Sequence, residues 1–232
     1  VYKRSDLQAV SDNELNKPYD LLKKVSNWRR FYAVINAASV FMEKAPRTVE
    51  LDRSYSEQNL KYDIAQVRAL RAFAYFYMVR IWGDVPLVTY SYDNGTFPSM
   101  PRTDAQTVLS YAKAELLTAI KDLPYQYGTQ TNLYYGSYGA QWQGKLFNKL
   151  SAYSVLAHIC AWQGNYAEAE TYSAFIIDHA SEINAKYTSI TDLTSETGLF
   201  YSNASVKGSR ILGFNFAHND NEATQSGHLE QL

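Results

Sequence analysis

The sequence predicts an all-α protein made of helical hairpins that carry long aromatic-rich loops. Through the first 185 residues, apolar side chains recur every three or four positions, which is the spacing of amphipathic helices. The periodic segments stop at glycine or proline, the residues that most often end helices. The chain also has 20 Tyr, 10 Phe and 4 Trp among its 232 residues, and many of these lie between the predicted helices. This aromatic excess indicates that the loops carry a function.

The first predicted helix covers about residues 13–45, with a break near Ser26 as an alternative. Ser11 and Glu14 precede it with the spacing of a capping box, in which each side chain bonds the other residue's backbone N–H. Pro46 is expected to end this helix, because proline removes a backbone donor and clashes with the preceding turn.

The second predicted helix covers about residues 57–82 and is expected to be central and buried. Gly83 should end it in a left-handed conformation, and Pro86 should hold Val85 extended, so the helix becomes an extended loop within three residues. The expected buried stripe consists of Ile64, Val67, Leu70, Ala74, Tyr77 and Ile81.

Three further helices are predicted, over about residues 103–123, 146–160 and 166–180. Thr103 and Gln106 should cap the first of them, and the other two form a hairpin. Beyond residue 185, Ser, Thr, Asn and Gly dominate, and the one expected strand is 211–217. We therefore predict a helical domain at 1–185, and at 186–232 the beginning of a loop-rich second subdomain that is truncated.

Composition argues against several classes of function. The formal net charge of −1 gives no field that would attract nucleic acid, and the single cysteine cannot form an internal disulfide. The four histidines lack metal-ligand spacing, and Ser110 with Lys113 resembles a Ser-x-x-Lys motif without its companion motifs. Residues 218–222 are more consistent with a solvated loop than with a calcium site. We expect no catalytic residues, no metal and no cofactor; an enzyme of carbohydrate turnover is the weakest alternative.

Residues 152–177 fit much of one tetratricopeptide repeat, a pair of packed helices. Ala157 and Ala169 supply its small positions, Gly164 its turn and Tyr166 its packing ring, whereas Ser173 replaces the usual large residue. Such repeats bind other molecules. The fold prediction is therefore one of TPR-like hairpins.

Three segments in order also resemble a known family. They are AQVRALRAFAYFYMVRIWGDVPLV, PRTDAQTVLSYAKAELLTAIKDLP and GKLFNKLSAYSVLAHICAWQGNYAEAETYS. From about Trp28 to Ile177 the sequence resembles the SusD/RagB family of outer-membrane nutrient-binding lipoproteins, and specifically its helical N-terminal region. The matching signature residues are Arg68, Arg71, Ala72, Trp82, Gly83, Asp84, Pro86 and Leu87.

Arg68 and Arg71 lie in an apolar, buried helix, so at least one guanidinium should be buried against an acceptor. A structural clamp on the helix end, with Asp84 as a partner, is the favoured interpretation. Direct contact with a ligand is the alternative.

The loop at 125–143 contains six aromatic residues and no charged ones. Tyrosine and tryptophan offer flat faces with a polar edge, and neutral amides and hydroxyls add hydrogen bonds, so the loop suits a sugar chain. Packing against the helices or a protein contact is the alternative. A second aromatic patch lies at 89–97, and the resemblance adds the N-terminal segment. The candidate ligand-binding residues are Tyr134, Tyr135, Tyr138, Trp142, Asn132, Tyr90, Tyr92 and Tyr2.

The resemblance implies cell-surface capture of oligosaccharides or polysaccharides and their delivery to a SusC-like TonB-dependent transporter of the outer membrane. Membrane attachment would be through a lipidated N-terminal cysteine, which this chain lacks. Family members are about twice as long, so the resemblance leads us to expect a truncated chain. The alternative is a TPR-like scaffold that binds a peptide or protein, including a peptide-capturing member of the same family.

Overall fold

A computed structural model describes residues 4–12, 14, 17–92, 98–129, 131, 133–136, 144–185 and 211–213. These residues belong to two compact units, one up to Arg30 and one from Phe31 to Gly213. The first unit contains α1 (Arg4–Ser11) packed against α2 (Asp20–Val25). Ser11 is the last residue of α1, so the predicted capping box at Ser11 is wrong.

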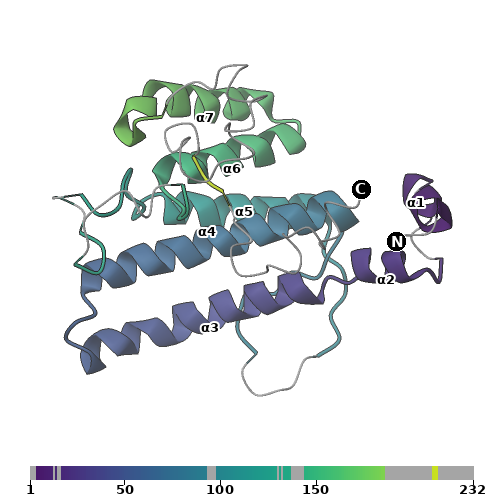
Figure 1. Cartoon of the computed structure of the whole chain (residues 1–232), viewed down its shortest axis with the longest axis horizontal. Helices are drawn as coiled ribbons and strands as arrows, with labels where there is room; N and C mark the ends of the chain where they lie inside the picture. The colour runs from purple at the N-terminus through teal and green to yellow at the C-terminus, as the bar shows by residue number, and fades with distance from the viewer. Residues whose placement is uncertain are drawn as a thin grey trace. The chain divides into compact units, whose positions relative to one another are not determined.

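The second unit is a set of helices, shown in Figure 1. Helix α4 packs along α5, α6 pairs with α7, and α5 contacts α6. The elements are α3 (Arg29–Leu51), α4 (Glu57–Trp82), α5 (Ala105–Ala119), α6 (Lys149–Trp162), α7 (Tyr166–Asp178) and the 3₁₀ helix η2 (Ala180–Ile183).

The all-α prediction is confirmed. The structure assigns no strand to the residues it describes, although an isolated antiparallel bridge joins Val85 to Thr103. Most of the expected strand at 211–217 lies outside the described residues. The TPR-like detail and the domain boundary at residue 186 stay predictions.

Helix α3 begins after a break at residues 26–28, so the predicted alternative of a break near Ser26 is confirmed. The helix continues through Pro46 to Leu51. Pro46 is exposed, where water can bond the carbonyl that the missing N–H leaves open. The prediction that Pro46 ends this helix is therefore wrong.

Helix α4 begins at its cap Ser56 and ends at Gly83. Gly83 has φ +69° and ψ −120°, a conformation open to glycine and costly for other residues, although it is not the left-handed helical one. The buried face of α4 includes the alanines Ala65, Ala69, Ala72 and the predicted Ala74, whereas the predicted Tyr77 and Ile81 are exposed. Small side chains allow α5 to lie close.

The later helices have polar caps of their own. Asp104, one residue after the predicted Thr103, caps α5 by accepting a hydrogen bond from the N–H of Thr107 at 3.0 Å. Asn148 and Ser151 form a capping box at the start of α6. Gly164, with φ +79°, turns the chain into α7. Tyr166 is 72% exposed, so its predicted role as a packing ring is wrong.

Candidate functional site

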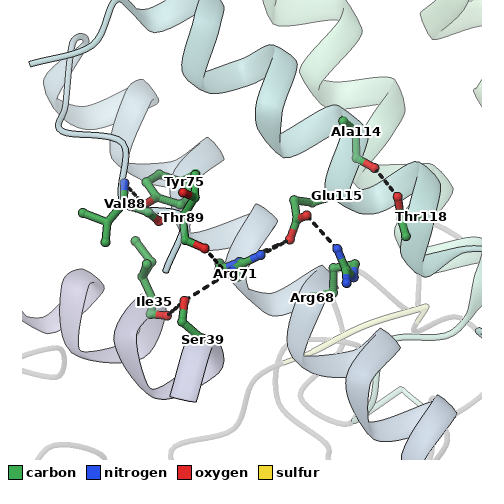
Figure 2. A network of polar contacts seen from close by, with 10 residues as sticks. All are labelled: Ile35, Ser39, Arg68, Arg71, Tyr75, Val88, Thr89, Ala114, Glu115 and Thr118. Atoms are coloured by element: carbon green, nitrogen blue, oxygen red, sulfur yellow. Dashed lines mark hydrogen bonds and ion pairs between the residues drawn. The ribbon is translucent and has the colours of Figure 1, made fainter. Parts of the chain in front are cut away.

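Two arginines of α4 share one carboxylate of α5, as Figure 2 shows. Nη1 of Arg68 lies 2.8 Å from Oε1 of Glu115, and Nη2 of Arg71 lies 2.5 Å from Oε2. Arg71 and Glu115 are both buried. Nη1 of Arg71 also donates to Oγ of Ser39 on α3, at 2.9 Å. This network therefore ties three helices together.

Asp84 does not supply the carboxylate for these arginines, and that prediction is wrong. Arg71 precedes the end of α4 by 11 residues, about 16 Å along the axis at 1.5 Å per residue. Asp84 instead accepts a hydrogen bond from the N–H of Ala105 at 2.9 Å, at the start of α5. The WGDVP signature thus caps the next helix in the chain.

Aromatic side chains fix the extended segment after Gly83. The carbonyl of Pro86 accepts a 2.6 Å hydrogen bond from the hydroxyl of Tyr32 on α3. The hydroxyl of Tyr75 bonds both the N–H and the carbonyl of Val88. Trp82 packs edge-on against Phe31, with 5.4 Å between ring centroids. The signature residues therefore contact α3 as well as α4.

The start of the tyrosine-rich loop packs into the helices. Tyr127 and Tyr134 are buried in a cluster with Tyr62 of α4. The ring of Tyr134 is only 6% exposed, so it does not present a face to solvent as a sugar-stacking residue would. Packing explains this part of the loop.

Tyr135, the next residue, is 52% exposed and lies parallel to Tyr55 from the turn between α3 and α4. Their ring centroids are 6.1 Å apart, with 27° between the planes. The hydroxyls of both donate to Oδ2 of Asp63, at 2.7 Å from Tyr55 and 2.5 Å from Tyr135. The hydroxyl of Tyr134 donates to Oδ1 of the same carboxylate. Three phenols from two loops therefore converge on one buried residue of α4.

The pair Tyr55 and Tyr135 forms one wall of a pocket of about 670 Å³, a volume within the range of small-molecule sites. The C-terminal half of α3 supplies the other wall, which includes Phe41 and Val40. Lys44, Thr48 and Asp52 add polar groups. The pocket is thus lined by rings and aliphatic side chains, with few charges. We call it the tyrosine pocket.

Both pocket phenols are held in the neutral form. Burial, followed by the hydrogen bond to Asp63, raises the pKa of Tyr135 to about 12. The same two causes raise the pKa of Tyr55. At neutral pH each ring therefore keeps its hydroxyl proton.

The second aromatic patch, Tyr90 and Tyr92, lies on another part of the unit. Tyr92 exchanges two hydrogen bonds with the side-chain amide of Asn36 on α3, and Ser91 donates to the carboxylate of Glu43. The hydroxyl of Tyr92 donates to that of Tyr90 at 2.7 Å, and Tyr90 is 50% exposed. This patch is well anchored, but it does not line the tyrosine pocket.

The structure thus places one predicted ligand-binding residue, Tyr135, in a pocket. Four others, Tyr2, Asn132, Tyr138 and Trp142, lie outside the described residues. Tyr55 and Asp63 were not predicted from the sequence as site residues. An aspartate within the predicted buried helix indicated that hydrogen-bond donors must lie next to it.

Among the described residues, no group of three His, Cys, Asp or Glu side chains could hold a metal ion, and no helix is long and apolar enough to cross a membrane.

Comparison with known proteins finds no matching family model but several similar chains. SusD-like protein P38 of Formosa agariphila is 29% identical over 169 residues, which cover 72% of this chain and 28% of the relative. A laminarin-binding SusD-like protein of known structure is 25% identical with a TM-score of 0.52, covering 70% of this chain and 31% of that one.

A crystal structure of a SusD superfamily protein from Bacteroides thetaiotaomicron VPI-5482 is 95% identical over 99% of this chain, with a TM-score of 0.87. This chain spans 50% of that protein. The order of helices, the WGDVP signature after α4 and these similarities lead to one conclusion. The chain belongs to the SusD/RagB family.

Proposed function

We propose that this chain binds neutral oligosaccharides or polysaccharides at the tyrosine pocket. The observation that carries the proposal is the stacked pair of Tyr55 and Tyr135, fixed by Asp63 at the wall of an open pocket. Aromatic rings pack against the apolar faces of sugar rings, while hydroxyl, amide and carboxylate groups at the rim bond sugar hydroxyls. The laminarin binding of one relative supports the same class of ligand.

For the whole protein, we propose a binding role at the cell surface without catalysis. Its partner would be a SusC-like TonB-dependent transporter, to which it delivers the captured glycan, and it would be held at the outer membrane as a lipoprotein. Family membership supports this assignment. Copurification of the full-length protein with the transporter from outer-membrane extracts tests it, and absence of the transporter from the purified material contradicts it.

Affinity gel electrophoresis tests glycan binding and its location. Laminarin, xylan and starch are each cast into the gel, and the retardation of the protein is measured. Tyr135→Ala should weaken binding to the retarding polysaccharide about fivefold or more, because a stacking face is lost. Tyr166→Ala is the matched control, since it removes an exposed tyrosine ring on α7 that does not line the tyrosine pocket.

The outcomes separate the candidate sites. Loss with Tyr135→Ala alone supports the tyrosine pocket. Loss with Tyr90→Ala alone moves the site to the patch of Tyr90 and Tyr92. Retardation by none of the polysaccharides, together with binding of peptides, would favour a peptide-binding scaffold over a glycan-binding protein.

A further inference from the structure

We infer that Asp63 binds the hydroxyl protons of Tyr55 and Tyr135, so that both phenol oxygens act only as hydrogen-bond acceptors toward a ligand in the tyrosine pocket. The ligand must then offer hydrogen-bond donors, such as the hydroxyls of a sugar, and carboxylate or sulfate groups are disfavoured. This inference rests on the proposed function and names the chemical class of its ligand.

The hydrogen bonds around Asp63 fix the direction of each proton. An ionised carboxylate only accepts hydrogen bonds, and a phenol has one proton to donate. The hydroxyls of Tyr55 and Tyr135 both bond Oδ2 and also bond each other, so their protons stay within this cluster, and Tyr134 donates its proton to Oδ1. The oxygens of the two pocket tyrosines therefore have only lone pairs for a further partner.

The backbone at Tyr135 shows that its ring position is specifically held. Tyr135 has φ +49°, which is uncommon for a residue other than glycine and costs free energy. Two side chains one turn apart on α4 hold it there: Asn59 accepts from its N–H at 3.3 Å, and Asp63 accepts from its hydroxyl. Helix α4 thus positions both the main chain and the phenol of this residue.

The two carboxylates near the pair act in the same direction. Asp63 lies directly behind both phenol oxygens, and Asp52 is part of the pocket lining. Hydrogen bonds from Ser54 lower the pKa of Asp52, which keeps it ionised. Lys44 is the cation of the lining and lies on α3. An oxyanion placed at the tyrosine pair would meet lone pairs backed by a carboxylate, whereas a sugar hydroxyl would donate to them.

The test compares neutral polysaccharides with charged derivatives of the same backbone. Laminarin and hydroxyethyl cellulose are the neutral probes, and carboxymethyl laminarin and carboxymethyl cellulose are the charged ones. We expect the neutral probe to bind at least about fivefold more tightly than its charged counterpart. Tyr135→Phe keeps the ring and removes the acceptor, so it should weaken neutral binding about fivefold and reduce the discrimination. Tyr166→Phe, at an exposed tyrosine of α7, should change neither.

Asp63→Asn tests the cause. An amide donates to one of the phenols, whose own proton is then released toward the pocket, so discrimination should fall although both rings remain. If Asp63→Asn does not fold, Tyr55→Phe and Tyr135→Phe still decide. Equal binding of neutral and charged probes, or discrimination that survives both phenylalanine variants, overturns this inference and leaves glycan binding intact. Retention of none of the four probes overturns the inference together with the proposed function.

Discussion

Single buried carboxylates organise this protein at the scale of residues. Glu115 accepts hydrogen bonds from Arg68 and Arg71, and Asp63 accepts them from three tyrosines. Burying an ionised group is costly unless its lone pairs are bonded, so each carboxylate needs several donors. The two carboxylates have different roles, because Glu115 joins helices and Asp63 orients the tyrosines of a pocket wall.

Glu115→Gln should strongly destabilise the protein. The amide cannot balance Arg71, whose side chain is 6% exposed, and breaking a buried ion pair typically costs about 3–5 kcal/mol. Chemical denaturation followed by circular dichroism measures the loss in free energy of unfolding. Glu168→Gln removes the partner of Lys113 in a more exposed pair and should shift the midpoint much less. Equal shifts in the two variants would contradict the structural role assigned to Glu115.

The sequence predicted that a buried arginine needs an acceptor, but it did not predict which residue is that acceptor. Arg71 was expected to bond a buried acceptor because it lies in an apolar helix. The acceptor is 44 residues away on α5, and only the packing of two helices brings it there. Asp63 was not predicted at all, since its donors come from two separate loops.

At the scale of elements, the start of α5 depends on two aspartates. Asp104 caps it locally, and Asp84 reaches it from the end of α4. The first backbone N–H groups of a helix have no partner within the helix, so each acceptor adds stability. This arrangement couples where α4 ends to where α5 begins.

Asp84→Ala should lower the free energy of unfolding by about 0.5–2 kcal/mol, the range for loss of an N-terminal helix acceptor. Thermal unfolding followed at 222 nm measures this change. Asp122→Ala is the control, because Asp122 is also an exposed aspartate near an end of α5, where its backbone N–H bonds the carbonyl of Ala119. The role of Asp84 is refuted if the control loses as much stability.

Helix ends were predictable where local chemistry decides them. The end of α4 was located correctly because Gly83 and Pro86 leave no helical alternative. The end of α3 was not, since the five residues after Pro46 continue the helix despite the lost donor. The buried face of α4 was predicted in part, because Ala74 of the expected stripe is buried whereas Tyr77 and Ile81 are exposed.

Over the whole molecule, burial of tyrosines links stability to alkaline pH. Burial raises the pKa of Tyr75 and Tyr127 above the ordinary value of 10, as it does for Tyr134. The folded protein therefore keeps phenol protons that the unfolded chain releases above about pH 10. Stability is full below that pH and falls as the pH rises further.

We predict cooperative alkaline unfolding in which the buried tyrosines ionise together with the loss of helix. Absorbance at 295 nm reports phenolate, and circular dichroism at 222 nm reports helix, along one titration from pH 8 upward. The steep phase at 295 nm should coincide with the fall at 222 nm. Complete phenol ionisation while the helices remain would show that these rings are accessible in the folded state.

The bridge between Val85 and Thr103, with two backbone hydrogen bonds of 3.2 and 3.0 Å, closes the base of the segment that leaves α4 and returns to α5. Residues 86–92 beyond this tie are also bonded to α3 and α4, so changes of sequence after Tyr92 should leave the register of both helices unchanged. Substitutions there should therefore change the free energy of unfolding of the helices little. Sequence variation at such a position is thus separable from the helical framework.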